Sequence, residues 1–191
     1  MNLRQIFSSS VFALWMSGVA SLQLNVTAIS ARDGSSTLEC WQVDQPFNIS
    51  TEPGTSGAAV AMLSSVANLS YSILPSNFDG GLHNAPRKQW VAFTSGLAYI
   101  TLPDDSTGTG AYVSGGAFGL IFAADTADVS ERGHRTQYLS NTETTSLSIP
   151  TSGGEVPEHS VLHMGPCSIN EINGIREFAL ADTGLDAARL R

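Results

Sequence analysis

The chain has 191 residues, nine Lys plus Arg against 17 Asp plus Glu, and a net charge of −8. With so few basic residues it has no stripe of cations to neutralise a run of phosphates, so we do not expect nucleic-acid binding. A content of 18 Gly and only 14% charged residues is typical of a secreted all-β domain.

Residues 1–21 have the pattern of a signal peptide. Arg4 supplies a positive start, an apolar segment follows, and cleavage is predicted after Ala20 or Ser21. An uncleaved amphipathic segment is the alternative. The apolar stretch is too short to span a bilayer, and no later stretch is apolar enough, so no membrane association is expected after cleavage. Residues 22–36 are interpreted as an extended N-terminal arm.

Three acceptor sites for N-glycosylation support a secretory location. Asn25, Asn48 and Asn68 each begin an Asn-x-Ser/Thr sequence, and Asn25 is expected to be exposed near the new N-terminus. We therefore predict a glycoprotein in the secretory pathway, either secreted or in the lumen of an endomembrane compartment.

Two cysteines, Cys40 and Cys167, lie near the two ends of the predicted globular part. In an oxidising compartment such a pair is most simply a disulfide. The alternative is two free thiols, with Cys167 activated by His163 four residues before it.

Short apolar segments separated by turn residues follow one another from Leu38 onward. Their even spacing predicts a sandwich or barrel within a single domain, residues 37–180. Residues 89–93 and 97–102 are predicted to pair as a hairpin through a Gly96 turn. Apolar residues at helical spacing from Ile169 to Phe178 predict a short C-terminal helix, and residues 181–191 are expected to be a flexible tail. The segments are 38–43, 58–63, 69–74, 89–93, 97–102, 111–114, 119–124 and 145–149.

The stretch from Gly80 to Gly96 resembles the first motif of the cupins, a family of jelly-roll β-barrels. In that motif a histidine, a second histidine, a carboxylate and a glycine follow at set distances. Here His83 and Gly96 keep their places, but Ala85 replaces the second histidine and Gln89 replaces the carboxylate. A neutral amide is a poor ligand for a transition metal. The resemblance therefore implies a cupin-like pocket without a metal or other cofactor.

Other histidines and cations are further candidates for chemistry. The strand at 116–125 resembles that of the second cupin motif, and His134 after it either fills the family's histidine position or is a surface residue. Arg87 lies near His83 and suits an acidic or phenolic ligand. His159 and His163 share one face if residues 159–163 form a regular strand. They then form either a metal-binding pair or a polar rim, and the rim is favoured.

Residues 39–167 resemble a group of small secreted fungal cupin-like proteins that includes hetero-Diels–Alderases of tropolonic sesquiterpenoid biosynthesis. The segments that carry this resemblance are 39–41, 53–57, 79–86, 123–128 and 156–159.

The resemblance implies dehydration of a hydroxymethyl tropolone to a quinone methide, and its cycloaddition onto a humulene-type alkene, with His83, Gln89, Arg87 and His134 as catalytic residues. Two alternatives remain open, a non-catalytic binding protein for an apolar small molecule or sugar, and a metal-dependent cupin enzyme. The sequence is also compatible with either a monomer or a homodimer.

Overall fold

The computed structural model describes residues 23–172, except for 52–55, 57–58, 62, 64 and 104. The predicted signal peptide and C-terminal tail lie outside these residues. Within them, no helix combines the length and the hydropathy that a membrane crossing requires.

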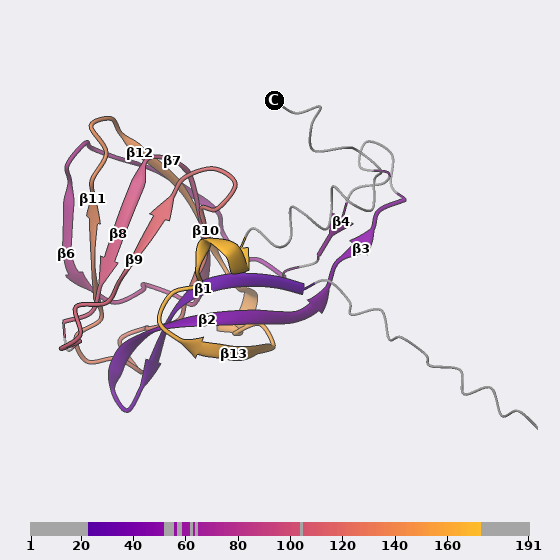
Figure 1. Ribbon diagram of the computed structural model, residues 1–191, viewed down its shortest axis with the longest axis horizontal. Helices are drawn as coiled ribbons and strands as arrows, with labels where there is room; N and C mark the ends of the chain where they lie inside the picture. Colours follow the sequence, from indigo (N-terminus) through magenta and orange to yellow (C-terminus); the bar gives the residue numbers. More distant parts are fainter. Residues whose placement is uncertain are drawn as a thin grey trace, which may run out of the picture.

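The described residues form two main β-sheets, so the predicted all-β fold is confirmed (Figure 1). Facing sheets of this kind are consistent with a jelly-roll-like barrel. Neighbouring strands are antiparallel except for β1 and β10, which are parallel. The seven-stranded sheet has the order β13 (His159–Met164), β2 (Ser35–Pro46), β1 (Gln23–Arg32), β10 (Leu120–Ala123), β7 (Gln89–Ser95), β12 (Thr144–Pro150) and β5 (Ser70–Leu74). The four-stranded sheet has the order β6 (Asp79–His83), β11 (His134–Tyr138), β8 (Leu97–Thr101) and β9 (Gly110–Ser114), and a small sheet pairs β3 (Asn48–Ile49) with β4 (Ala59–Val60).

The interpretation of residues 22–36 as an arm is wrong, because residues 23–32 form β1 inside the large sheet. Val26 and Ala28 pack on one face of this sheet and Ile29 packs on the other, all at 2% exposure or less. A strand buried on both faces shows little hydrophobic alternation, so its sequence does not look amphipathic. Its parallel partner β10 lies about ninety residues away in the chain, which local sequence patterns cannot indicate.

The predicted hairpin is also corrected. The turn at Gly96 carries the chain from β7 in one sheet to β8 in the other, and the two strands pair with different neighbours. Gly96 has a φ of +83°, and a Cβ there would lie 2.2 Å from the Thr144 hydroxyl. Glycine is required at this corner because any side chain would collide with the adjoining strand β12.

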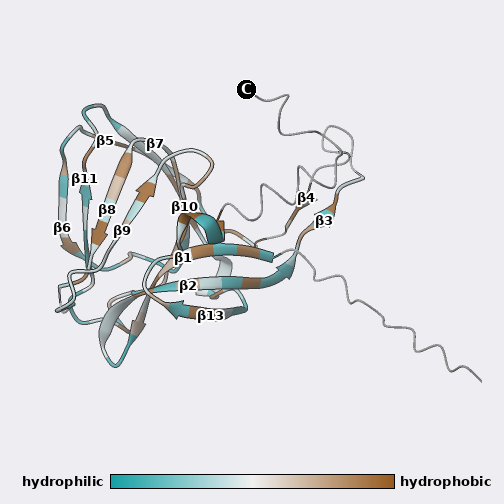
Figure 2. Ribbon diagram, viewed as in Figure 1, coloured by the Kyte–Doolittle hydropathy of each residue, from teal (hydrophilic) through white to brown (hydrophobic). Residues whose placement is uncertain are grey.

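Two apolar clusters pack on opposite faces of the seven-stranded sheet, and the brown segments in Figure 2 follow the strands that carry them. The cluster between the sheets includes Phe93 and Ile100. The other is built around three large aromatics, Trp41, Trp90 and Phe122. The inner cluster forms the wall of a cavity that contains the functional candidates.

The C-terminal region is fixed by the predicted disulfide between Cys40 and Cys167, which is confirmed with a Cα–Cα distance of 4.7 Å. A helical turn at residues 169–172 follows it. Ser168 and Glu171 cap this turn reciprocally, since the main-chain N–H of each residue donates to the side-chain oxygen of the other. The rest of the predicted helix lies outside the described residues.

The three glycosylation candidates differ in their surroundings. Asn48 and Asn68 are exposed, as an acceptor site requires. Asn25, predicted to be exposed, is half-buried on β1, and its side-chain nitrogen donates to the Glu171 carbonyl at 3.2 Å. Since a glycan would have to be attached to that nitrogen, Asn48 and Asn68 are the better acceptors.

Candidate active site

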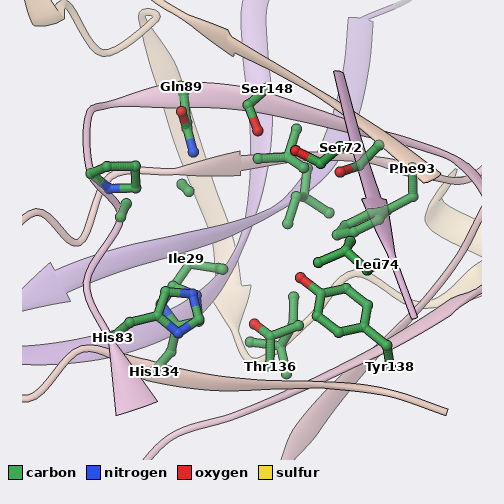
Figure 3. A pocket seen from close by; sticks show the side chains of 17 residues that line it. Ile29, Ser72, Leu74, His83, Gln89, Phe93, His134, Thr136, Tyr138 and Ser148 are labelled. Atoms are coloured by element: carbon green, nitrogen blue, oxygen red, sulfur yellow. The ribbon is translucent and has the colours of Figure 1, made fainter. Parts of the chain in front are cut away.

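A cavity of about 210 Å³ lies between the two sheets and holds three of the four predicted catalytic side chains (Figure 3). In Figure 3, His83 and His134 project from one side of it, and Gln89 and Ser148 lie across from them. Much of the remaining wall is apolar. The lining residues are Ile29, Ser72, Leu74, His83, Ala85, Pro86, Gln89, Val91, Phe93, Ile100, Ile121, Ala123, His134, Thr136, Tyr138, Ser146 and Ser148.

His134 is buried at the start of β11, and a hydrogen bond with Asp125 fixes its imidazole ring. Its Nδ1 lies 2.7 Å from Oδ2 of Asp125, whose side chain is fully buried. An ionised carboxylate only accepts hydrogen bonds, so this contact places the imidazole hydrogen on Nδ1. His134 therefore presents Nε2 as the nitrogen available to a ligand.

The buried carboxylate is itself fixed by a network of polar groups. Oδ2 of Asp125 accepts a hydrogen bond from the Ser36 hydroxyl at 2.7 Å, and Oδ1 lies 3.4 Å from the main-chain nitrogen of Ala85. The Asn84 amide donates to the main-chain carbonyls of Asp125 and Ser130. Because the acceptor atoms are engaged, the carboxylate can remain buried and keep the imidazole in one orientation.

His83 faces His134 from the neighbouring strand β6, with the two ring centroids 4.6 Å apart. His83 is exposed, and its Nδ1 lies 3.0 Å from the Gly81 carbonyl, which leaves Nε2 available. Gly133 makes this pairing possible, since a Cβ there would lie 2.1 Å from the His83 carbonyl oxygen. The two strands thus approach closely enough to place one exposed and one buried imidazole at the same cavity wall.

The other two predicted catalytic residues, Gln89 and Arg87, line different cavities. Gln89 is buried on β7 and lines the cavity. Arg87 does not line it; this side chain and Lys88 line a separate cavity formed by neighbouring loops.

Sequence reasoning did not identify Asp125 or Tyr138 as site residues. Tyr138 lines the cavity beside Phe93, and burial raises the pKa of its phenol above the ordinary value of 10.0. The phenol therefore stays protonated and can donate a hydrogen bond. Asp125 lay within a segment that carried the family resemblance, at the end of a predicted strand, but no sequence spacing links it to His134.

The donor set of the cavity does not fit a cupin metal centre. Ala85 is buried and lines the cavity beside His83, but it has no ligand atom, and Gln89 offers only a neutral amide. Asp125 already binds Nδ1 of His134. In the described part of the chain, only Cys40, His163 and Glu171 gather three metal-binding atoms, and Cys40 is in the disulfide.

The second pair of histidines lies on β13, away from the cavity. His159 stacks on Trp41 with a centroid distance of 3.6 Å, and His163 lies 2.9 Å from a carboxylate oxygen of Glu171. A register shift between Val161 and His163 breaks the regular alternation of this strand. The prediction that both imidazoles share one face therefore fails, as does a metal site built on it.

No protein-family model and no curated protein matches the sequence. Among solved structures, the chain is similar to the polyketide cyclase RemF from Streptomyces resistomycificus, with 15% identity and a TM-score of 0.33, over 73% of this chain and 92% of RemF. It is also similar to NovW, a 4-keto-6-deoxy sugar epimerase from the novobiocin biosynthetic gene cluster of Streptomyces spheroides, with 10% identity and a TM-score of 0.31, over 88% of this chain and 96% of NovW. Similarity this low does not indicate an activity, which has to be argued from the cavity.

Proposed function

We propose that this protein is an enzyme that moves protons on a small ring-containing substrate, with His134 as its central acid–base group. The observation that carries the proposal is the buried 2.7 Å contact between His134 and Asp125 at the cavity wall. A buried carboxylate on one imidazole nitrogen orients the ring and stabilises its protonated form. The other nitrogen then gives or takes a proton, a role that typically accelerates a reaction about 10²–10⁴-fold.

The reaction proposed is the hetero-Diels–Alder sequence that the family resemblance implies. Overall, dehydration of a hydroxymethyl tropolone removes a hydroxyl from the side chain and a proton from the ring hydroxyl, which together amount to one water. In this proposal protonated His134 donates its proton to the departing hydroxyl, which leaves as water, and neutral His83 accepts the ring proton and returns a proton to His134 before the next turnover. Two imidazoles with centroids 4.6 Å apart supply both the acid and the base.

The size and polarity of the cavity suit one ring of this kind. Its volume of about 210 Å³ lies below the roughly 300–1,000 Å³ of pockets that enclose a drug-sized ligand. We therefore propose that the tropolone ring lies inside and that the sesquiterpene alkene approaches through the mouth. Tyr138 and Gln89 donate hydrogen bonds to the ring oxygens, and the apolar wall holds the reactants in a near-attack pose.

A non-catalytic binding protein is the second candidate. The hydrogen bonds from Asn84 and Ser36 make Asp125 a link between segments distant in the chain, and such a network also serves stability alone. The two candidates differ in what His83→Ala does. In an enzyme this change lowers the rate and leaves ligand affinity nearly unchanged, because an exposed side chain contributes little to the apolar contacts.

The test is to incubate the purified native protein with a hydroxymethyl tropolone and humulenol, and to measure the rate of product formation and the diastereomer ratio. The proposal predicts a rate and a ratio that differ from those of the uncatalysed reaction. A native protein that binds the tropolone but leaves both values at the uncatalysed level supports the binding protein instead.

We further propose that the protein works in an oxidising compartment of the secretory pathway. The disulfide between Cys40 and Cys167 supports this location, because such bonds persist where thiols are not kept reduced.

A further inference from the structure

A second cavity, of about 470 Å³, lies beside the first, opens to the surface and is lined by residues from four segments of the chain. The loop from β6 to β7 is common to both, because Pro86 and Gln89 line the first cavity while Arg87 and Lys88 line the second. The other walls come from residues near Ala67, Asp128 and Thr151. None of the chemistry proposed for the first cavity uses these side chains.

The lining of the second cavity carries an excess of positive charge in an acidic protein. Arg87 and Lys88 are adjacent, and Asp128 is the one carboxylate among the described lining residues. The Thr126 hydroxyl and, to a smaller extent, the charge of Lys88 lower the pKa of Asp128, so this carboxylate is ionised and offsets one cation. The lining therefore has a formal charge of +1, whereas the whole chain has −8.

Arg87 differs from other arginines that the structure describes. Arg135 is paired with Asp79, and Arg32 lies 3.7 Å from a carboxylate oxygen of Glu39. Arg87 makes no such contact with a carboxylate in the described part of the chain. Its guanidinium is a planar fork of donors that matches the two oxygens of a carboxylate.

The walls around Arg87 are held in place by main-chain hydrogen bonds. The N–H of buried Thr151 donates to the Lys88 carbonyl at 3.1 Å, and the N–H of Ala67 donates to the Pro150 carbonyl at 2.7 Å. Gly153 and Gly154 line the same cavity and add no side chain to fill it. A pocket with fixed walls loses little entropy when a ligand binds.

We propose that the second cavity binds the carboxylate of a small organic acid, with Arg87 forming paired hydrogen bonds to it and Lys88 adding charge. A formal charge of +1 matches a monoanionic carboxylate better than a phosphate dianion. The site goes beyond the proposed reaction and does not depend on it, because neither of the substrates named there carries a carboxylate.

The probe for this site is benzoate, titrated into ¹⁵N-labelled native protein at constant ionic strength. The amide signals of Arg87, Lys88 and Gly153 are expected to shift with one common affinity. Arg87→Gln keeps a polar side chain but shortens it and removes the charged guanidinium, and is expected to weaken benzoate binding about tenfold. Arg135→Gln is the matched control and should leave the affinity unchanged, because Arg135 lies on strand β11 and pairs with Asp79.

Two further measurements separate a carboxylate site from simple charge attraction. Asp128→Asn removes the opposing charge, and should tighten benzoate binding and bring inorganic phosphate closer to it in affinity. Lys88→Gln should weaken benzoate binding, but less than Arg87→Gln does. Equal benzoate affinity in native protein and Arg87→Gln would overturn the proposal, as would shifts centred on His83 and His134, or tighter binding of phosphate than of benzoate by native protein.

Discussion

The two histidine pairs of this chain differ in the residues that contact them. His83 and His134 line a cavity, and a fully buried carboxylate holds the second imidazole. His159 and His163 lie on an edge strand, where one ring stacks on Trp41 and the other contacts the partly exposed carboxylate of Glu171. A histidine that has a buried acidic partner and faces an open cavity can exchange a proton with a ligand. His159 and His163, the edge pair, make only structural contacts.

Sequence spacing alone would favour His159 and His163 as the two imidazoles that lie together, because they are only four residues apart. The other pair is 51 residues apart and is joined only by the register of β6 and β11. On β13 the register shift places His159 opposite Val43 and His163 opposite Cys40, which face opposite sides of the sheet. One irregular residue is therefore enough to separate two imidazoles that a regular strand would bring together.

The largest predicted effect is on catalysis. His134→Ala and Asp125→Asn should each lower the rate of tropolone dehydration about 10²–10⁴-fold, because one removes the acid–base group and the other removes the charge that stabilises it. His159→Ala and His163→Ala are the controls and should keep the native rate. Steady-state assays of the four variants compare their rates of tropolone dehydration. A similar loss of rate in all four variants would show that His134 and Asp125 have no special role in catalysis.

The next largest predicted effect is on stability and concerns the disulfide beside the edge pair. The disulfide closes a loop with a sequence separation of 127 residues, so its removal should lower the free energy of unfolding by about 5 kcal/mol in the chain-entropy model. The double variant Cys40→Ser and Cys167→Ser, compared with native protein by urea denaturation, tests this. Since Cys40 lies opposite His163, hydrogen exchange should increase on β13 before it increases near Asp125. Equal midpoints in urea would contradict the expected role of the disulfide.

A gain of metal binding is the third predicted effect. Ala85 and Gln89 both line the cavity beside His83 and His134, so Ala85→His together with Gln89→Glu should complete a set of three imidazoles and one carboxylate. Elemental analysis should then find about one equivalent of zinc after dialysis, against much less in native protein. Tightly bound stoichiometric metal in native protein that is lost in His83→Ala would favour a metal-dependent cupin enzyme.

Much of the strand pattern could be predicted from sequence, because alternation and turn residues are local. All eight predicted apolar segments overlap strands, and β5 alternates as a strand with two different faces does: Tyr71 and Ile73 face outward while Ser72 and Leu74 line the cavity. Strand β1 was missed because it is buried on both faces. The hairpin at Gly96 was wrong because local turn chemistry does not reveal that a chain changes sheets.

The candidate site was less accessible to sequence analysis. His83, Gln89 and His134 were found through the family resemblance, which gives positions but not partners. The role of Asp125 depends on contacts with Ser36, Ala85 and His134, which lie on different segments of the chain. Tyr138 looks like any aromatic residue on a strand. Arg87 was grouped with His83 because the two are close in sequence, but its side chain lines the second cavity.

The smallest predicted effect is the pH dependence of the edge pair. A hydrogen bond with the Met164 carbonyl and the contact with Glu171 raise the pKa of His163 above 6.5, so its contribution is complete below that pH and is lost as the pH rises through the folded-state pKa. Ser168 and His163 lower the pKa of Glu171 below 4.5, so its contribution is present above 4.5 and is lost as the pH falls through that lowered value.

The contact should therefore be strongest between about pH 4.5 and 6.5. The Ile172 amide, which donates to the Ser168 carbonyl, should have a higher protection factor at pH 5.5 than at pH 8.5. Both side chains are partly exposed to solvent, so the change is expected to be small. Glu171→Gln should remove most of the difference. Protection that is independent of pH in the native protein would show that the contact does not form in solution.

In the proposed mechanism, His134 and Asp125 transfer the proton while the cavity sets the geometry of cycloaddition. The most direct measurement compares native protein with His134→Ala on two substrates, the intact hydroxymethyl tropolone and a pre-formed quinone methide, each with humulenol. We expect the variant to lose about 10²–10⁴-fold in rate on the intact tropolone but to give the native diastereomer ratio from the quinone methide. A variant that retains the native rate on the tropolone, or that loses selectivity on the quinone methide, would contradict this mechanism.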